Sequence, residues 1–306
     1  FILSPVTVFG DAGNDTLVLG SNNADSIDAN ITFNGGTHIS GTGDRIVIND
    51  TAPTYNVRYD VAPTVVTRDG ANLPRTIGYS TTEGIVINAG SGADTVNFLN
   101  GVAATVTAFG NNGNDNFIVG GGNLTGVQPQ TFNGGAGTDQ ITFDDHLDNT
   151  NRIWDIRNNE VLFGGLISLF TTSFESVGIL AGNGADEITF AGVLGQFFNI
   201  DAGGGSDTFI LGFQNSVFFS NPVTLNGGSQ GTTFNINDAA VSAFTTLSMD
   251  GGNGFNSMNV NIPSVVGFNI GEGYFIPGNG GAFFYSNVNT RTFNGNASNN
   301  IYTVYS

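Results

Sequence analysis

The chain of 306 residues contains no cysteine and no lysine, and it has only two histidines. Without cysteine, disulfide bridges and cysteine-ligated zinc sites are excluded, which is compatible with a secreted protein that needs no covalent cross-links. Without lysine, the G-x-x-x-x-G-K-[ST] phosphate-binding loop is excluded. Two isolated histidines also give no sequence pattern for a catalytic triad.

Positive charge and long apolar runs are scarce as well. All seven basic residues are arginines, against 25 acidic residues, and the formal net charge is −18 at pH 7. Binding to nucleic acid or to an anionic membrane surface needs clustered Lys and Arg, so neither partner is expected. No stretch approaches 18 apolar residues, so no membrane insertion is expected.

Glycine and phenylalanine are abundant, with 46 and 26 residues, and 39% of the chain is hydrophobic. Short runs rich in Val, Ile, Phe and Thr alternate with turn residues, as in 15–19 and 207–211. No segment keeps a helical period over ten residues. These features predict an all-β fold with enough apolar side chains for a core.

A nine-residue phrase at 134–142 reads G-G-x-G-x-D-x-U-x, where U is a large apolar residue, and it recurs along the chain. Successive copies lie about 24 residues apart, and this period predicts a parallel β-helix (β-solenoid) of about 12–13 coils with roughly 24 residues per coil. Close variants begin at Gly10, Ala89, Gly110, Ala181 and Ala202, and degraded copies end on Asp44, Thr232, Asn256 and Asn300.

A longer period lies above this one, because residues 83–98 match residues 175–190. The chain is therefore predicted to be a single β-helix over 1–306, built from three degenerate four-coil blocks at approximately 1–130, 131–225 and 226–306. Residues 51–80 and 144–176 lack the glycine phrase, and the first segment is rich in Pro and Arg. Both are expected to leave the sheets as exposed excursions.

The phrase at 134–142 resembles the RTX calcium-binding repeat, and the longer blocks resemble the repeats of very large secreted or cell-surface proteins of bacteria. The resemblance implies an extracellular rod of structural or adhesive type, and it implies calcium where the acidic corners are intact. The acidic positions of the repeats, which are the candidate calcium ligands, are Asp15, Asp44, Asp94, Asp115, Asp139, Asp186 and Asp207.

Two roles remain open for these acids. Stacked strands lie ~4.8 Å apart, so the carboxylates of successive coils repel one another and a bound calcium ion would remove that repulsion. Alternatively, each Asp accepts hydrogen bonds from turn amides and caps its turn. Replacement by Thr232, Asn256 and Asn300 in the last third favours capping, because these side chains hold calcium poorly.

The densest acidic cluster, formed by Asp144, Asp145, His146 and Asp148, raises the alternative of a polysaccharide hydrolase or lyase. Only Asp145 has an acidic counterpart in the sister block, Asp50, and no lysine is present to stabilise an enolate. We therefore interpret the cluster as a solvated turn and expect no enzyme activity.

A third alternative is a glycan-binding module with Tyr59, Trp154 or the Tyr79 region as stacking platforms, although aligned aromatic residues in repeats usually belong to the core.

Residues 6–9 and 301–305 are strand-like and carry no charge. They predict end-to-end association, or continuation into further coils of a longer polypeptide. The leading prediction is a non-enzymatic structural or adhesive rod that is secreted or displayed on a bacterial cell surface.

Overall fold

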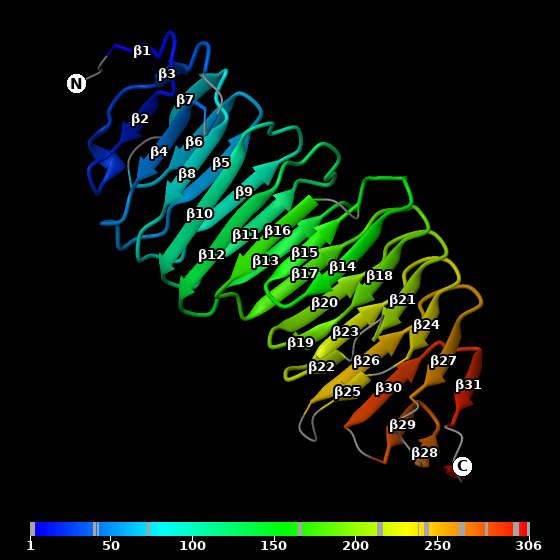
Figure 1. Cartoon of the computed structure of the whole chain (residues 1–306). Helices are drawn as coiled ribbons and strands as arrows, with labels where there is room; N and C mark the ends of the chain where they lie inside the picture. The colour runs from blue at the N-terminus through cyan, green and yellow to red at the C-terminus, as the bar shows by residue number, and fades with distance from the viewer. Residues whose placement is uncertain are drawn as a thin grey trace. The chain divides into compact units, whose positions relative to one another are not determined.

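The computed structural model is almost entirely β-structure, and Figure 1 shows strands following one another along the chain. A short 3-10 helix at Ala24–Ser26 (η1) is the one helix in the part of the chain that is described, and no helix there is long and apolar enough to cross a membrane. The structure describes residues 4–38, 41, 43–71, 74–164, 167–212, 217–237, 239–241, 245–262, 267–278, 281–295 and 300–304.

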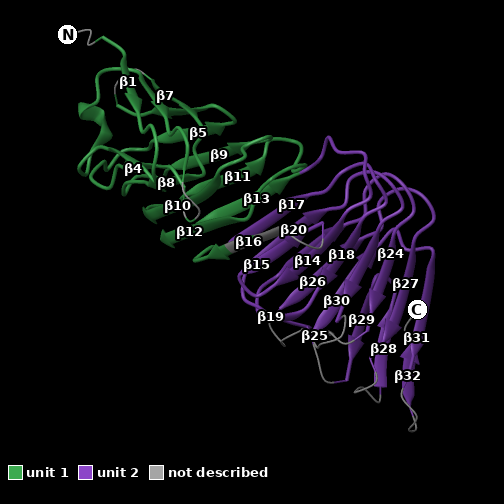
Figure 2. Ribbon diagram, turned by 45° about the horizontal axis from the view of Figure 1, so that its top comes forward, with its two compact units in different colours: residues 1–144, 169–174 green, residues 145–168, 175–306 purple. Residues whose placement is uncertain are grey.

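The chain forms two compact units (Figure 2). Unit 1 comprises residues 1–144 and 169–174, and unit 2 comprises residues 145–168 and 175–306. These units do not coincide with the three predicted sequence blocks, which describe duplication rather than compactness.

Unit 1 holds two sheets. The first contains, in spatial order, β1 (Val6–Phe9), β3 (Ile31–Asn34), β7 (Arg75–Ser80), β6 (Val65–Asp69), β5 (Arg58–Ala62), β9 (Thr95–Leu99), β11 (Asn116–Gly120) and β13 (Gln140–Asp144). The second contains β2 (Thr16–Leu19), β4 (Arg45–Asn49), β8 (Gly84–Asn88), β10 (Thr105–Asn112), β12 (Gln130–Ala136) and β16 (Ile167–Thr172).

Unit 2 holds two long sheets and one short sheet. The first contains β17 (Ser176–Leu180), β20 (Phe197–Asp201), β23 (Val223–Asn226), β26 (Thr246–Asp250), β30 (Ala282–Ser286), β29 (Tyr274–Pro277), β28 (Gly267–Gly271) and β32 (Ile301–Val304). The second contains β15 (Glu160–Phe163), β14 (Ile153–Arg157), β18 (Glu187–Phe190), β21 (Thr208–Leu211), β24 (Thr233–Ile236), β27 (Ser257–Asn261) and β31 (Thr290–Asn294). The third contains β19 (Gly192–Leu194), β22 (Val217–Phe219) and β25 (Ala239–Val241).

The strand pairing follows the sequence repeat. β11 pairs in parallel with β9 and with β13, and β21 pairs in parallel with β18 and β24. The hydrogen bonds that join neighbouring repeats span 21 residues from Asp94 to Asp115 and 24 residues from Asp115 to Asp139, the same intervals as the phrase. The prediction of an all-β fold with long parallel sheets is therefore confirmed.

The large apolar residue of the phrase forms the core. In unit 1, Val96, Phe117 and Ile141 lie opposite one another on β9, β11 and β13, and each is fully buried. In unit 2, Phe209 lies opposite Phe234, and their rings stack with centroids 5.2 Å apart. Burying such a side chain stabilises a fold by about 1.5–3 kcal/mol, so each repeat contributes through its contact with the next one.

The two segments expected to leave the sheets instead add strands to them. Within 51–80, β6 pairs antiparallel with both β5 and β7, while β5 pairs in parallel with β9 and β7 with β3. Within 144–176, β14 pairs antiparallel with β15 and in parallel with β18. The reason is the alternation of apolar side chains: Tyr59, Val61 and Val66 are fully buried. Pro63 and Pro74 stay outside the strands, where no ladder amide is needed.

A further insertion of this kind lies in unit 2 and was not predicted from the sequence. There β29 pairs antiparallel with both β28 and β30, while β30 pairs in parallel with β26. Its buried members include Phe268, Phe275 and Phe283. Antiparallel strands are thus inserted between parallel neighbours in both units.

Candidate functional site

The seven candidate acids occupy the same place in their repeats, because each one directly precedes a strand of its unit. Six of them are at most 2% exposed, whereas Asp15 is half-buried. In unit 1 the acids precede β2, β4, β9, β11 and β13, and in unit 2 they precede β18 and β21. A carboxyl group buried this deeply needs hydrogen-bond partners.

In unit 1 the partner is the backbone of the preceding repeat. The N–H of Asp94 donates to Asp115 Oδ1, and the N–H of Asp115 donates to Asp139 Oδ1, both at 2.7 Å. The N–H of Asp15 donates in the same way to Asp44 Oδ1 at 2.7 Å. Asp44, Asp94 and Asp115 are therefore donors through their backbone and acceptors through their side chains. We call this arrangement the acid ladder.

In unit 2 the acid ladder has the same geometry. The N–H of Arg152 donates to Asp186 Oδ1 at 2.7 Å, and the N–H of Asp186 donates to Asp207 Oδ1 at 2.9 Å. Further along, the N–H of Thr232 donates to Asn256 Oδ1 at 2.7 Å. A threonine backbone and an asparagine side chain thus continue the ladder without a carboxylate.

The second carboxyl oxygen packs against the glycine that starts the phrase. A Cβ atom on Gly110 would lie 2.2 Å from Asp115 Oδ2 and 2.4 Å from the carbonyl oxygen of Gly134. On Gly134 it would lie 2.7 Å from Asp139 Oδ2 and 2.2 Å from the carbonyl oxygen of Ser173. Only glycine fits at Gly110 and Gly134, whereas the copies that begin at Ala89, Ala181 and Ala202 accept alanine at the same place. A buried carboxyl oxygen and a carbonyl oxygen both face this narrow space.

The asparagine repeat shows what this space favours. Asn256 Nδ2 donates to the carbonyl oxygen of Asn287 at 2.7 Å, and a Cβ on Gly251 would lie between these two atoms. In the aspartate repeats an ionised carboxylate has no proton to donate there. Burial accordingly raises the pKa of Asp115 and of Asp207 to about 7, because desolvation disfavours the charged form.

The pKa of Asp94 and of Asp186 is raised less, to about 6, again chiefly by burial. Their second oxygens do have donors, because the N–H of Gly90 binds Asp94 Oδ2 at 2.9 Å and that of Gly182 binds Asp186 Oδ2 at 3.2 Å. Hydrogen bonds to the charged form lower a pKa, so these amides offset part of the desolvation.

This geometry fits the capping of backbone amides better than calcium coordination. Calcium takes six to eight oxygen ligands at ~2.3–2.6 Å, whereas Oδ1 of six of the seven acids, all but Asp15, already accepts a backbone N–H. An amide donor and a cation compete for the same lone pairs. Calcium binding by the seven acids stays a prediction, and capping is the role for which the contacts are present.

The acidic cluster at 144–148 is not the solvated turn that the sequence predicts. Asp145 is fully buried and Asp148 is 8% exposed. Arg152 closes the cluster, because its Nη2 lies 2.5 Å from Asp148 Oδ2 and its Nε lies 3.8 Å from Asp145 Oδ2. Hydrogen bonds from Thr150 and Arg152 keep the pKa of Asp148 below its usual value although burial acts against them.

The aligned acid of unit 1, Asp50, has a matching environment. Its Oδ2 accepts hydrogen bonds from Tyr59 Oη and from Arg68 Nε, both at 2.6 Å, and all three residues are at most 3% exposed. Each of these acids has an arginine side chain beside it: Arg68 lies beside Asp50, and Arg152 lies beside Asp145. Neither acid therefore offers a free carboxylate to a substrate. Their arrangement is that of a structural ion pair.

The proposed stacking platforms for glycans are core residues. Tyr59 and Trp154 are fully buried, and Tyr79 is 6% exposed. The hydroxyl group of Tyr79 donates to the carbonyl oxygen of Ala62 at 2.5 Å, and burial raises its pKa to about 12. The glycan-binding alternative therefore loses the aromatic residues on which it was based.

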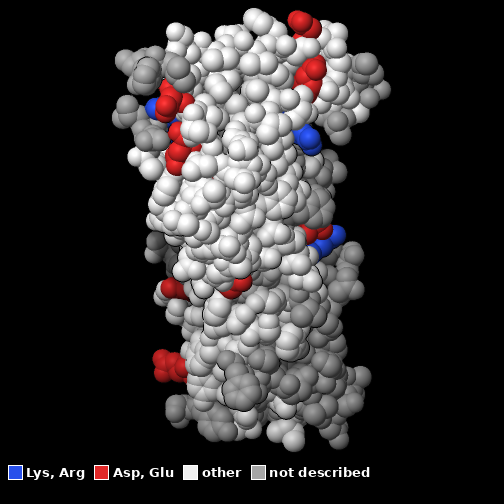
Figure 3. Space-filling view, turned by 90° about the vertical axis from the view of Figure 1, so that its left-hand side faces the viewer, with Lys and Arg blue, Asp and Glu red and all other residues white. Residues whose placement is uncertain are grey.

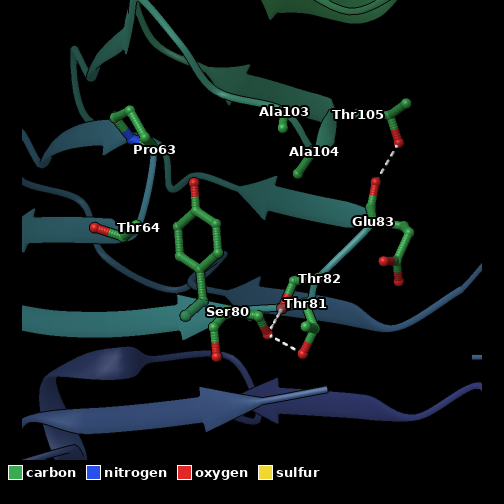
Figure 4. A pocket seen from close by; sticks show the side chains of 10 residues that line it. Pro63, Thr64, Ser80, Thr81, Thr82, Glu83, Ala103, Ala104 and Thr105 are labelled. Atoms are coloured by element: carbon green, nitrogen blue, oxygen red, sulfur yellow. Dashed lines mark hydrogen bonds between the residues drawn. The ribbon is translucent and has the colours of Figure 1, made fainter. Parts of the chain in front are cut away.

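A hollow of about 550 Å³ in unit 1 is a further candidate for a substrate site (Figure 4). Its lining consists mainly of hydroxyl and methyl groups, and Glu83 is the one acid among the described lining residues. Hydrolysis of a glycoside requires two carboxyl groups about 5–10 Å apart. The hollow therefore gives no support to the polysaccharide-hydrolase alternative.

Sequence analysis missed two acceptors of the ladder. Glu83 Oε2 accepts the N–H of Asp44 at 2.7 Å, and Asn289 Oδ1 accepts the N–H of Asn256 at 2.7 Å. Glu83 could have been found, because it directly precedes an alternating run at 84–88 just as the aspartates do.

A comparison with protein-family models and a comparison with curated proteins each gave no match to this chain.

Proposed function

We propose that the chain is a β-solenoid that serves as a non-enzymatic structural or adhesive element outside the cell, secreted or displayed on a bacterial surface. The observation that carries this proposal is the acid ladder, because a contact repeated from Asp94 to Asp139 and again from Arg152 to Asp207 holds successive repeats together. Repetition of one stabilising contact suits length and surface better than a single reaction centre.

The surface chemistry supports the same proposal. In unit 2, Asn199, Thr224 and Ser248 form an exposed row across β20, β23 and β26. On the face shown in Figure 3, the coloured charged side chains are few and are separated by uncharged atoms. Such rows of hydroxyl and amide groups offer regularly spaced hydrogen bonds to another chain or to a surface glycan, and they do not suit nucleic acid.

Self-association end to end, or pairing with further coils of the same polypeptide, is the interaction that we propose for the outermost strands. β1 is the last strand of its sheet, and the N–H groups of Val6 and Gly10 donate to Asn30 and Asn34 on the β3 side. Because alternate amides of a parallel strand point to opposite sides, the N–H of Thr7 faces the open edge. An open edge is a template for another strand.

The test is the effect of Thr7→Pro on association. Proline removes the outward amide and leaves the bonds to β3 intact, so we expect the concentration-dependent assembly of the wild-type chain to be lost in light scattering and negative-stain microscopy. Thr7→Val keeps the amide and is the matched control, with assembly expected at wild-type level. A wild-type chain that stays monomeric at every concentration, or a Thr7→Pro variant that assembles normally, would contradict the proposed interaction.

A further inference from the structure

A histidine and two acids meet in unit 1, at the point where the ladder changes from aspartate to glutamate. Asp44 directly precedes β4 and Glu83 directly precedes β8, and these strands pair in parallel with Arg45 opposite Gly84. His38 lies between β3 and β4, and its Nδ1 is 3.2 Å from Glu83 Oε1. One nitrogen or oxygen atom from each of the three side chains lies within 4.8 Å of the others.

Backbone contacts fix the two acids relative to each other. The N–H of Asp44 donates to Glu83 Oε2 at 2.7 Å, and the N–H of Glu83 donates to the carbonyl oxygen of Asp44 at 2.9 Å. The glutamate side chain is one methylene longer than aspartate. While Oε2 takes the place of the ladder acceptor, Oε1 therefore extends beyond the ladder to the imidazole of His38.

Asp44 is the ladder acid that lies beside further ligand atoms. The residue is fully buried, and its Oδ1 accepts the N–H of Asp15. Its Oδ2 packs against Gly35 and, like Oδ2 of Asp115 and Asp207, has no hydrogen-bond partner among the described residues, but only at Asp44 do a histidine and a second acid complete a possible ligand group there. A buried carboxyl oxygen with free lone pairs, next to a second carboxylate and an imidazole, is a strong electron donor without an acceptor.

We propose that His38, Asp44 and Glu83 bind a divalent transition-metal ion of the zinc class. Imidazole nitrogen with carboxylate oxygen is a ligand set of such ions, whereas calcium and magnesium take oxygen ligands. Three protein ligands leave a fourth position for water. This site lies beyond the proposed structural function, because the described residues form no second group of three such ligand atoms.

The geometry requires only a small adjustment. Zinc binds nitrogen and oxygen at ~2.0–2.2 Å, so two of its ligand atoms lie at most ~4.4 Å apart. The side chains of His38 and Glu83 are 43% and 34% exposed, so they can rotate toward the ion while Asp44 stays fixed by the ladder. Glu83 also lies at the border of the hollow in Figure 4, where its side chain points away from Pro63 and Thr64.

The experiment is isothermal titration of the full chain with zinc chloride, with calcium and magnesium chloride in parallel. We expect one zinc ion per chain, at least tenfold weaker binding in His38→Gln and in Glu83→Gln, and weaker binding of calcium and magnesium. His146→Gln removes the other histidine, which lies in unit 2, and is the matched control with unchanged binding.

His38 is exposed, so His38→Gln is expected to fold, and far-UV circular dichroism verifies this. The absence of zinc binding to the wild-type chain would overturn the proposal. Equal affinity in wild type and His38→Gln would overturn it too, and so would a loss of binding in His146→Gln.

Discussion

At the scale of single residues, the acid ladder makes stability depend on pH. Burial raises the pKa of Asp115 and of Asp207 to about 7, whereas an aspartate in an unfolded chain titrates near ~3.9. Asp115 is faced by Asp94 and Asp139, and Asp207 by Asp186 and Asp201, and these like charges raise the pKa further. Between these pH values the folded chain binds more protons than the unfolded chain.

We therefore predict that these groups contribute most to the free energy of unfolding below about pH 4, and that this contribution is lost as the pH rises through their raised pKa of about 7. Each pKa unit corresponds to about 1.4 kcal/mol. Asp115→Asn supplies an amide donor in place of the proton, as Asn256 does in its own repeat. The variant should be more stable than the wild type at pH 8 and similar to it near pH 4 in urea denaturation.

The exposed acid Asp69 gives the control, because Asp69→Asn should not raise stability at pH 8. If Asp115→Asn were less stable than the wild type at pH 8, the ladder would need the charged carboxylate, and the interpretation as a protonated cap would be wrong.

A second prediction at the residue scale concerns glycine. Gly135 has φ +107°, and a Cβ on it would lie 1.9 Å from the carbonyl oxygen of Asn111 on the paired strand β10. Gly126 in the same unit also has a positive φ, +80°, but has open space around it. Gly126→Ala should cost about 1–2 kcal/mol of stability from backbone strain alone. Gly135→Ala should cost at least ~2 kcal/mol more, because the paired strand has to shift.

Thermal or urea unfolding of the two variants measures this difference. Equal stability of Gly135→Ala and Gly126→Ala would show that strands β10 and β12 can separate locally at little cost, contrary to the close contact described here.

At the scale of the elements, the ladder predicts the response to calcium. Oδ1 of Asp94, of Asp115 and of Asp139 each accepts a hydrogen bond from a backbone N–H. We therefore expect the melting temperature in excess EGTA to equal that in millimolar calcium. A ligand that binds only the folded chain raises the melting temperature by an amount that increases with its affinity and concentration. A rise of several degrees that disappears in Asp115→Asn would favour the calcium prediction over capping.

Sequence analysis predicted much of the strand pattern because two local signals coincide in each repeat. The glycine phrase marks the turn, and the apolar residue two positions after the acid marks the inward face, as with Phe117 after Asp115. In the structure these positions are buried, except Leu17 after Asp15, which is half-buried. The place of each acid at the start of a strand also follows from the phrase.

The inserted strands could not be predicted in the same way. Around β5 and β6 the proline and arginine residues suggested an exposed loop, yet Arg68 is 3% exposed because Asp50 and Asp25 both bind it. Asp25 and Asp50 lie 43 and 18 residues before Arg68 in the sequence, and no local pattern links them. His38, Asp44 and Glu83 were not recognised as a group for the same reason.

At the scale of the whole molecule, the formal charge of −18 counts every acid as ionised. Several ladder acids are buried and have raised pKa values, so the chain carries less negative charge near neutral pH than its composition indicates. Self-repulsion within each unit is reduced accordingly.

The ladder also has a direction. In both units the backbone N–H of an earlier repeat donates to the side chain of a later one, from Asp94 to Asp115 and from Asp186 to Asp207. One face of a repeat therefore offers donors and the opposite face offers acceptors. Ladder contacts cannot form between two like faces, since donor would meet donor. In the proposed end-to-end association, copies joined by such a contact would all point the same way, and growth would have a distinguishable front and rear.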